Sequence, residues 1–318
     1  MLMELDPRRL RVLRAVSLRG GMAAAAQLLH LTPSAVSQQL AQLEREVGQP
    51  LIDRSRRTAS LTPAGELLAA RAERIEQELT EARRELTELS GRLSGPVTVA
   101  AFSSAVCHLV VPALLELATT HPDLEPEVVE LEGPPALSEL RTGGLDLVIA
   151  EDDTDESGTV GPLRGLSAVP VADDEYCIVT PSGWSPQPGS IKDLAARPWV
   201  ACPPDTACGR ALDRIAAQHG FTAQRAHTCL EFPTVLALVA AGFGAAIAPK
   251  LALTGASPGA IAMPPVPVAG HRRITALRRE LPAGPEPVTQ AVVDALQAVV
   301  LDLGLTPVAT PRNPRPRT

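Results

Sequence analysis

The stretch AAAAQLLHLTPSAVSQQLAQLE, residues 23–44, decides the fold of the N-terminal part of this chain. It predicts two short helices joined by a tight turn. Thr32 can accept hydrogen bonds from the free amide groups that begin the second helix, and Pro33 at the first helical position removes no donor that the helix needs. Apolar residues then recur at helical spacing and form one buried stripe. These residues are Val36, Leu40, Leu43 and Val47.

The opposite face of the second helix carries hydroxyl and amide side chains. A helix fits the major groove of duplex DNA, where such groups can bond base edges and phosphates. We therefore interpret it as a recognition helix. The predicted DNA contacts on it are Thr32, Ser34, Ser37, Gln38 and Gln42.

The flanking segments support this interpretation. An amphipathic run from Leu10 to Leu18 predicts a first helix that stops at the glycine pair 20–21. Gly48 is placed to end the recognition helix, and residues 51–62 predict a short hairpin, or wing. We expect three arginines at its tip to approach phosphates or the minor groove: Arg54, Arg56 and Arg57. The alternative is a three-helix bundle that binds no partner.

Charge is distributed as DNA binding requires. The whole chain is acidic, with a net charge of −7, yet residues 1–62 hold nine arginines against five acidic residues. A basic head on an acidic body confines phosphate attraction to one end of the molecule. No aromatic residue precedes Phe102, so stacking platforms for single strands are absent there. The predicted partner is duplex DNA.

Residues 63–92 predict one long helix with an apolar seam at alternating spacings of four and three. Such a heptad seam is typical of coiled coils, and a helix of this length, roughly 45 Å, is too long to lie on a small winged domain. We therefore expect the seam to pair with a second copy of the chain; packing on the chain's own body is the alternative. The predicted dimerisation residues are Leu68, Ala72, Ile75, Leu79, Ala82, Leu86 and Leu89.

The N-terminal part resembles the LysR-type transcriptional regulators. The matching residues are Ala24, Ala25, Leu28, Thr32, Ala35, Val36, Ser37, Gln39, Leu40, Leu43, Glu44, Gly48, Leu51, Arg54, Leu61, Thr62, Ala64 and Gly65. The chain departs from the family at residues 21–23, where a Ser or Thr usually opens the second helix, at Ser34 after Pro33, and at Gln38, which replaces a common Arg. The resemblance implies the docking mode but not the operator sequence.

From residue 97 short apolar strands alternate with helices, which predicts an α/β body with a mostly parallel sheet. Expected strands include 97–101, 127–131, 145–150, 168–171, 176–180 and 272–277, with helices at 104–119, 134–142, 208–218, 231–240 and 286–302. The resemblance extends here and implies a two-lobed effector-binding domain similar to periplasmic binding proteins. The whole chain is thus predicted as a winged helix-turn-helix domain (1–62), a linker and dimerisation helix (63–92), an effector-binding domain (93–305) and a disordered tail (306–318). Within the body, lobe one is predicted at 97–168 and 270–303 and lobe two at 173–264, with crossings near 169–173 and 264–269.

Ligands of open α/β sheets bind beyond the carboxyl ends of the strands. This rule selects six candidate effector contacts: Ser103, Ser104, Gly133, Glu151, Pro204 and Thr206. Ser104 also matches the family's usual ligand-contacting hydroxyl and heads a helix whose free amides could bind a carboxylate or phosphate. We expect Ser104 and Thr206 to face each other across the cleft; for each residue the alternative is a simple helix cap.

The chain also bears on compartment and chemistry. It has no run of eighteen apolar residues and no signal-peptide pattern at its start, so we expect a cytoplasmic protein that does not bind membranes. Its five cysteines show no metal-ligand spacing, and we expect no cofactor and no metal. Expected partners are duplex DNA, a small-molecule effector, a second copy in a homodimer or dimer of dimers, and RNA polymerase.

Two alternatives remain open. Redox sensing through Cys202 and Cys208 is one, because a branch of the family uses a cysteine pair near this place, although Ala217 occupies the expected position of the resolving cysteine. An α/β enzyme fused to a DNA-binding domain is the other. No nucleophile elbow, metal-binding helix or phosphate loop favours it, so we predict that the protein is not an enzyme.

Overall fold

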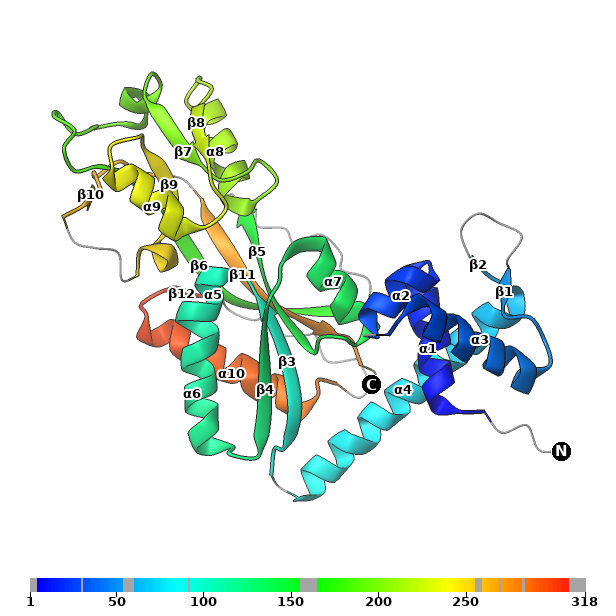
Figure 1. The fold of residues 1–318 in the computed structure, drawn as a ribbon. Coiled ribbons are helices and arrows are strands. Elements are labelled where there is room, and N and C mark those ends of the chain that lie inside the picture. The colour runs from blue at the N-terminus through cyan, green and yellow to red at the C-terminus, as the bar shows by residue number, and fades with distance from the viewer. Residues whose placement is uncertain are drawn as a thin grey trace, which may run out of the picture.

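The computed structural model describes residues 5–29, 31–53, 60–90, 92–154, 165–254, 259–268, 270–281 and 284–308. A small helical head lies at one end of the molecule, and a long helix, α4, joins it to a larger α/β body (Figure 1). Of the predicted functional residues, Arg54, Arg56 and Arg57 lie outside the described residues, as do residues 309–318 of the predicted tail.

The head is a winged helix-turn-helix. Its elements are α1 (Pro7–Arg19), α2 (Met22–Leu28), α3 (Pro33–Val47), β1 (Ile52–Asp53) and β2 (Ser60–Leu61). The α1 and α3 helices both end at a glycine in the left-handed conformation, Gly20 and Gly48. The predicted helices and hairpin are therefore confirmed, except that Leu18 of the first predicted stripe is 42% exposed instead of packed in the core.

Helix α4 (Pro63–Ser90) is continuous over 28 residues. Its start packs closely on the wing: a Cβ added at Gly65 would come within 2.2 Å of the Leu51 carbonyl oxygen. This position therefore needs a residue without a side chain. The close approach fixes the direction in which α4 leaves the head.

The body is built from strands and helices that alternate along most of the chain. They are β3 (Gly95–Ala101), α5 (Ser103–Ala105), η1 (Val106–Val110), α6 (Val111–Thr120), β4 (Leu124–Glu130), α7 (Gly133–Thr142), β5 (Leu147–Thr154), β6 (Leu166–Pro181), η2 (Ile191–Leu194), β7 (Pro198–Ala201), α8 (Ala207–Gln218), β8 (Gln224–Thr228), α9 (Phe232–Ala240), β9 (Ala246–Pro249), η3 (Lys250–Leu253), β10 (Ile261–Ala262), β11 (His271–Arg279), α10 (Pro287–Asp302) and β12 (Thr306–Pro307).

The main sheet is mixed, which makes the prediction of a mostly parallel sheet wrong. Its strand order is β10-β6-β11-β5-β3-β4, with β9 and β12 also paired to β6. Only the β3–β4 and β3–β5 pairs of this sheet are parallel in the described residues, while β11 is antiparallel to β5 and to β6. The reason is that β6 leaves the first lobe and β11 returns beside it in the opposite direction.

Strand β6 runs unbroken through the segment where the sequence pattern predicts two separate strands. Asp173 and Asp174 interrupt the apolar pattern there, but they face Arg273 and Arg272 across the ladder to β11. Opposite charges on facing strands stabilise the pairing, so the acidic residues continue the strand. Further along, β12 pairs with β6, so the described structure extends to residue 308 and the predicted tail at residue 306 starts too early.

The body has two lobes with separate cores, and a smaller third cluster fills the space between the lobe-one sheet and α7. The core of lobe one lies between the β3–β5 strands and helices α6 and α10, and the core of lobe two lies among β7, β9, α8 and α9. Along β6 the side chains change from one core to the other between Ala172 and Tyr176, and along the return between Val266 and Ile274. These changes overlap both predicted crossings and extend a few residues beyond them.

The helical stretch Ser103–Thr120 is long and apolar enough to cross a membrane, by length and composition alone. One face of it is fully buried in lobe one, with Ala105, Leu109 and Ala113 at 0% exposure. The stretch packs against α10. Its place in the core of this lobe explains the apolar character of the buried face, while Val111 and Leu115 on the stretch remain exposed.

Candidate functional site

Helix α3 presents a polar face away from the core of the head. The Thr32 hydroxyl caps its start, accepting a hydrogen bond from the Ala35 amide at 3.2 Å. Val36, Leu40 and Leu43 are fully buried on the other side. Amides and hydroxyls that a fully packed helix holds outward are suited to reading a groove.

The predicted DNA contacts differ in how free they are. Ser34 and Gln38 are exposed, and Ser37 is half-buried. The Gln42 amide nitrogen donates to Glu46 at 3.2 Å, so this side chain is partly engaged within the head. Gln39 is also exposed, and the sequence pattern did not select it as a DNA contact.

Several arginines of the head are used inside the protein. Arg9 pairs with Glu46, and Arg14 pairs with Glu73 of α4. Arg19 pairs with Glu139, one of the residues of α7 in the body. The excess of nine arginines over five acidic residues therefore overstates the positive charge that faces DNA.

The head rests on lobe one through helices α1 and α7. Arg14 Nη1 donates to the Thr142 carbonyl at 2.9 Å, and Arg19 Nη1 donates to the Ser138 hydroxyl at 2.8 Å. Figure 1 shows the head beside α7. These contacts set the position of the head against the body within one chain.

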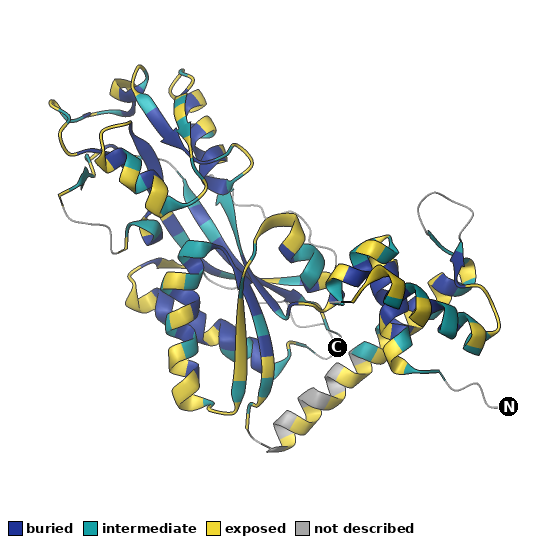
Figure 2. Ribbon diagram, viewed as in Figure 1, coloured by how far each residue is buried: buried dark blue, intermediate teal, exposed yellow. Residues whose placement is uncertain are grey.

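The apolar seam of α4 lies in two different environments. Ala72 is 4% exposed and Leu68 packs beside it, both in the core of the head, so these two residues of the predicted dimerisation seam are not available to a second copy. From Ile75 onward the seam is open, because Leu79 is 48% and Leu89 84% exposed. Figure 2 shows that the described residues in this part of α4 are mostly exposed. Ala82 and Leu86 are also exposed.

A cavity of about 370 Å³ lies between the lobes. Lobe one contributes the start of the α5–η1 helical stretch, and lobe two contributes α9 and the segment around β10. The lining residues are Ser103, Ser104, Cys107, His108, Glu231, Phe232, Pro233, Leu236, Ala237, Ala240, Ala252, Thr254, Ala260 and Ile261. Burial lowers the pKa of His108, so this imidazole is neutral at pH 7.

Arg272 of β11 lies behind Ser104, a residue of the cavity wall, and joins the strands that cross between the lobes. It is 1% exposed, and its Nη atoms donate to Glu151 at 2.6 Å and to Asp174 at 2.7 Å. Both Nη atoms also lie 3.3 Å from the Ser104 hydroxyl. The flanking carboxylates raise the pKa of Arg272 despite its burial, so the cation is held firmly in place.

Two further carboxylates lie near this group, one from each lobe. Glu132 precedes α7 in lobe one, and Glu231 precedes α9 in lobe two. The pKa of Glu132 is raised, first by partial burial and then by the negative charges of Glu151 and Glu231. The charge of Glu231 in lobe two therefore acts on the carboxyl group of Glu132 in lobe one.

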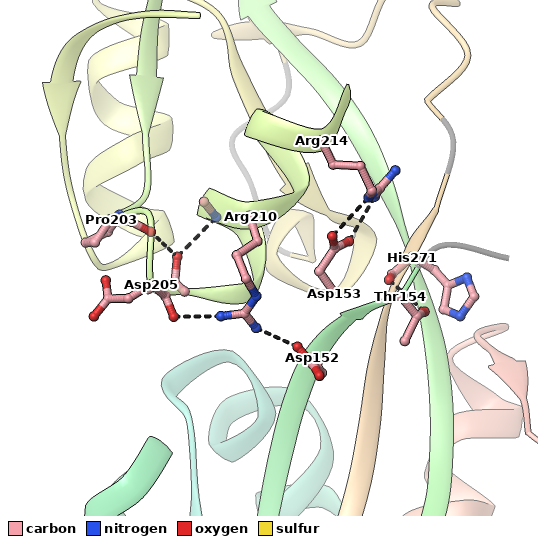
Figure 3. Close-up of polar contacts among 10 residues, drawn as sticks. Asp152, Asp153, Thr154, Pro203, Asp205, Arg210, Arg214 and His271 are labelled. Carbon is pink, nitrogen blue, oxygen red and sulfur yellow. Dashed lines mark hydrogen bonds and ion pairs between the residues drawn. The ribbon is translucent and has the colours of Figure 1, made fainter. Parts of the chain in front are cut away.

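Ion pairs also link the lobes directly. Arg210 and Arg214 on α8 reach the end of β5, where they meet Asp152 at 2.5 Å and Asp153 at 2.8 Å (Figure 3). The Arg214–Asp153 pair is largely buried, at 18% and 8% side-chain exposure. These pairs link α8 of lobe two to the end of β5 in lobe one.

The structure brings some of the predicted effector contacts together and leaves others apart. Ser103 and Ser104 line the cavity, and Glu151 joins Ser104 through the shared arginine. Gly133 and Pro204 are exposed and do not belong to its wall. The Thr206 hydroxyl donates to the Pro203 carbonyl and accepts from the Gly209 amide, so Thr206 caps α8 and does not face Ser104 across the cavity.

Five residues of this site do not stand out in the sequence: Arg272, Asp174, Glu132, Glu231 and Phe232. The sequence gives one indication of this site, which is the pair of adjacent arginines at the start of an apolar strand, Arg272 and Arg273. A buried strand carries such residues when facing carboxylates pair with them. The partners come from β5 and β6, which a linear pattern does not connect.

The cysteine pair is in contact but enclosed. Cys202 and Cys208 are 4% and 5% exposed. The Cys208 thiol donates its proton to the Ile247 carbonyl at 3.1 Å, and the neighbouring sulfur atoms act on each other so that the pKa of Cys202 is lowered and that of Cys208 is raised. Contact permits a reaction between the thiols, while burial restricts access by an oxidant.

Known proteins resemble both parts of the chain. The family model "Bacterial regulatory helix-turn-helix protein, lysR family" matches residues 7–66, and "LysR substrate binding domain" matches residues 90–300. The HTH-type transcriptional regulator GbpR of Rhizobium radiobacter is 31% identical over 68% of this chain and 72% of its own. The probable HTH-type transcriptional regulator LrrA of Synechococcus elongatus is 30% identical over 86% of this chain and 88% of its own.

Solved structures share the fold over nearly the whole length. A full-length OxyR variant from Pseudomonas aeruginosa has a TM-score of 0.66 at 19% identity and covers 98% of this chain and 99% of its own. CbnR, described as a LysR family transcriptional regulator, has a TM-score of 0.54 at 21% identity and covers 92% of this chain and all of its own. With matches to both of its domain models and to relatives over most of its length, the chain belongs to the LysR family of transcriptional regulators.

Proposed function

We propose that this regulator binds duplex operator DNA as a homodimer, or as a dimer of dimers, and that a small molecule in the cavity between its lobes changes this binding. LysR regulators are not enzymes, and binding of DNA and of effectors is their shared activity. The observation that carries the proposal is a cavity lined by both lobes, with Ser104 on one side and Glu231 on the other. A ligand that contacts both lobes can favour one arrangement of them over another.

A promoter reporter tests the cavity even before the effector is identified. Genomic footprinting first identifies the target promoters, whose activity is then followed across growth media. Ala237→Phe fills the cavity wall with a ring, so we expect the reporter to lose its variation between media. Ala217→Phe places the same ring on an exposed position of α8, outside the cavity, and serves as the control. A cavity-filled variant that varies like the unmodified protein would refute the proposal.

Redox sensing is the second candidate, favoured by the contact between Cys202 and Cys208. It requires peroxide to change promoter activity and requires Cys202→Ser to remove that change. Loss of the response to growth media in Ala237→Phe, with an unchanged peroxide response, would assign regulation to the cavity and leave the thiols a separate role.

Action in the cytoplasm and contact with RNA polymerase complete the proposal. Both follow from the DNA-binding role of the family. A pull-down of purified polymerase on operator fragments, with and without the regulator, tests the contact.

A further inference from the structure

The walls of the interlobe cavity are mostly apolar, and their charge is of one sign. Among the described lining residues, Glu231 is the single side chain charged at pH 7, since burial keeps His108 neutral. Ser103 and Ser104 supply hydroxyls beside it. A charged group of a ligand that enters this space therefore meets a carboxylate first.

Cations on the strands and helices around the cavity are already paired, among them Lys250 of η3 with Glu175. Arg272 carries one positive charge and pairs with two carboxylates, those of Glu151 and Asp174, so the negative charge exceeds the positive charge in this group. Arg210 and Arg214 are paired with carboxylates at the end of β5. In the described part of the chain no ion pair neutralises Glu132 or Glu231, so the cleft keeps an excess of negative charge.

Two buried hydrogen-bond donors in the cluster around Arg272 have no partner among the described residues. The Tyr176 side chain is 4% exposed and its hydroxyl makes no hydrogen bond, nor does Nε of Arg272, within the described residues. Tyr176 follows Asp174 by two residues along β6, so its side chain lies on the same face of the strand as the carboxylate that binds Arg272. Buried donors without acceptors are costly and rare in folded proteins. Their presence points to an acceptor supplied from outside the chain.

We propose that the effector is a small compound that carries an ammonium or guanidinium group and, at its other end, a hydrogen-bond acceptor. Its cationic group binds Glu231 on the cavity wall, with Glu132 of lobe one nearby. Its acceptor reaches past the Ser104 hydroxyl to two free donors that lie behind the wall, Nε of Arg272 and the Tyr176 hydroxyl. This inference rests on the proposed function, because it names the class of ligand for the same cavity. It replaces our sequence-based expectation of an anion at the start of the α5 helix.

The arrangement also gives the ligand a physical means of moving the lobes. Glu132 and Glu231 carry like charges on opposite lobes, and the repulsion between them opposes approach. A cation between them turns repulsion into attraction on both sides. The lobes are then drawn together only when the ligand is bound, which is the differential interaction that a switch requires.

Three matched probes test the class of ligand: aminobutanol, butanediol and hydroxybutanoate, each substituted at both ends of a four-carbon chain. All keep one hydroxyl, and the other end is cationic, neutral or anionic. Unfolding of the full-length protein is followed by tryptophan fluorescence at constant ionic strength. Both tryptophans of the chain, Trp184 and Trp199, lie in lobe two, so the signal reports this lobe.

We expect aminobutanol alone to raise Tm in a saturable way, on the order of 5 °C. Glu231→Gln, a substitution of equal size, should remove most of this rise, and Tyr176→Phe should reduce it. Glu116→Gln removes an exposed carboxylate from α6, outside the cavity, and should retain the full rise.

Three results would overturn the inference: no saturable rise with aminobutanol, an equal rise with butanediol, or a rise that Glu231→Gln retains. A saturable rise with hydroxybutanoate that Ala237→Phe removes would also overturn the cationic class, yet it would keep the cavity as the effector site. Failure of the proposed function itself is seen separately, as a cavity-filled variant that still responds to growth media.

Discussion

The two halves of α4 follow one heptad spacing but lie in different surroundings. In the first half Ala72 is 4% exposed, within the core of the head, while in the second half Leu79 is 48% exposed. The same apolar spacing therefore packs into the core of the head at one end of α4 and forms an exposed apolar stripe at the other. Exposed contiguous apolar surface usually marks an interface, so the first half belongs to the domain and the second to the assembly.

The largest effect is expected at the buried half. Ala72→Asp places a charge among packed apolar side chains, which should destabilise the head by about 3 kcal/mol or more. The measurement is chemical denaturation followed by the helical circular dichroism signal. Ala70→Asp adds the same charge two residues away at an exposed position and should leave stability almost unchanged. Equal stability of the two variants would show that this half does not belong to the head's core.

At the exposed half the expected effect is on mass and not on stability. Leu79→Glu puts a charge in the centre of the open stripe, where a second copy offers no partner for it, so the dimer should dissociate. Light scattering should report the mass of one chain, with the circular dichroism spectrum unchanged. Leu67→Glu, at a position 63% exposed but off the seam, is the matched control and should keep the dimer. An undiminished mass for Leu79→Glu would exclude the stripe as the interface.

If the first half of α4 completes the head, base reading by α3 should not depend on the second half. Gln38→Ala should change the preference at one base position of each half-site by about 1–3 kcal/mol. The same change should appear in the Leu79→Glu background, where only overall affinity falls. Competition binding with operators altered one base pair at a time measures both. A preference change that vanishes in the monomer would mean that the head is shaped by assembly.

The smallest effect concerns the cleft, where Glu132 has no ion-pair partner among the described residues. The pKa of Glu132 is raised in the folded protein, so ionisation of this carboxyl group lowers the stability of the fold. The protonated group contributes its full stability below the ordinary pKa of 4.5. This contribution is lost as the pH rises through the pKa of Glu132 in the folded protein. Glu132→Gln should therefore raise Tm slightly at neutral pH. This gain should shrink as pH falls toward 4.5. A gain that is independent of pH would mean that charge is not its cause.

Much of the head could be predicted from the sequence because its signals are local. A cap, a helix start, an apolar stripe and a terminal glycine all lie within residues 32–48. The heptad seam is equally visible in the sequence, but the sequence does not show that its first half is buried in the head and its second half exposed. Ala72 is buried because α4 packs against α1 in the core of the head. The spacing of apolar residues alone does not show which other helix covers them.

The cleft shows the same limit more strongly. The ends of strands predict Ser104 and Glu151 but not Arg272 and Asp174, because each of these two lies inside a stretch whose pattern indicates an apolar or broken strand. Their pairing depends on β11 returning beside β6 after nearly a hundred residues. Side chains that meet through sheet topology are not connected by any local pattern.

Hydroxyl-radical footprinting on an identified operator tests most directly the central claim, that the open half of α4 joins two heads so that two α3 helices read DNA together. We expect two protected half-sites about one helical turn apart for the unmodified protein, and protection of single half-sites, at higher protein concentration, for Leu79→Glu. Two equally spaced half-sites with the Leu79→Glu variant at the same concentration, or a single half-site with the unmodified protein, would contradict it.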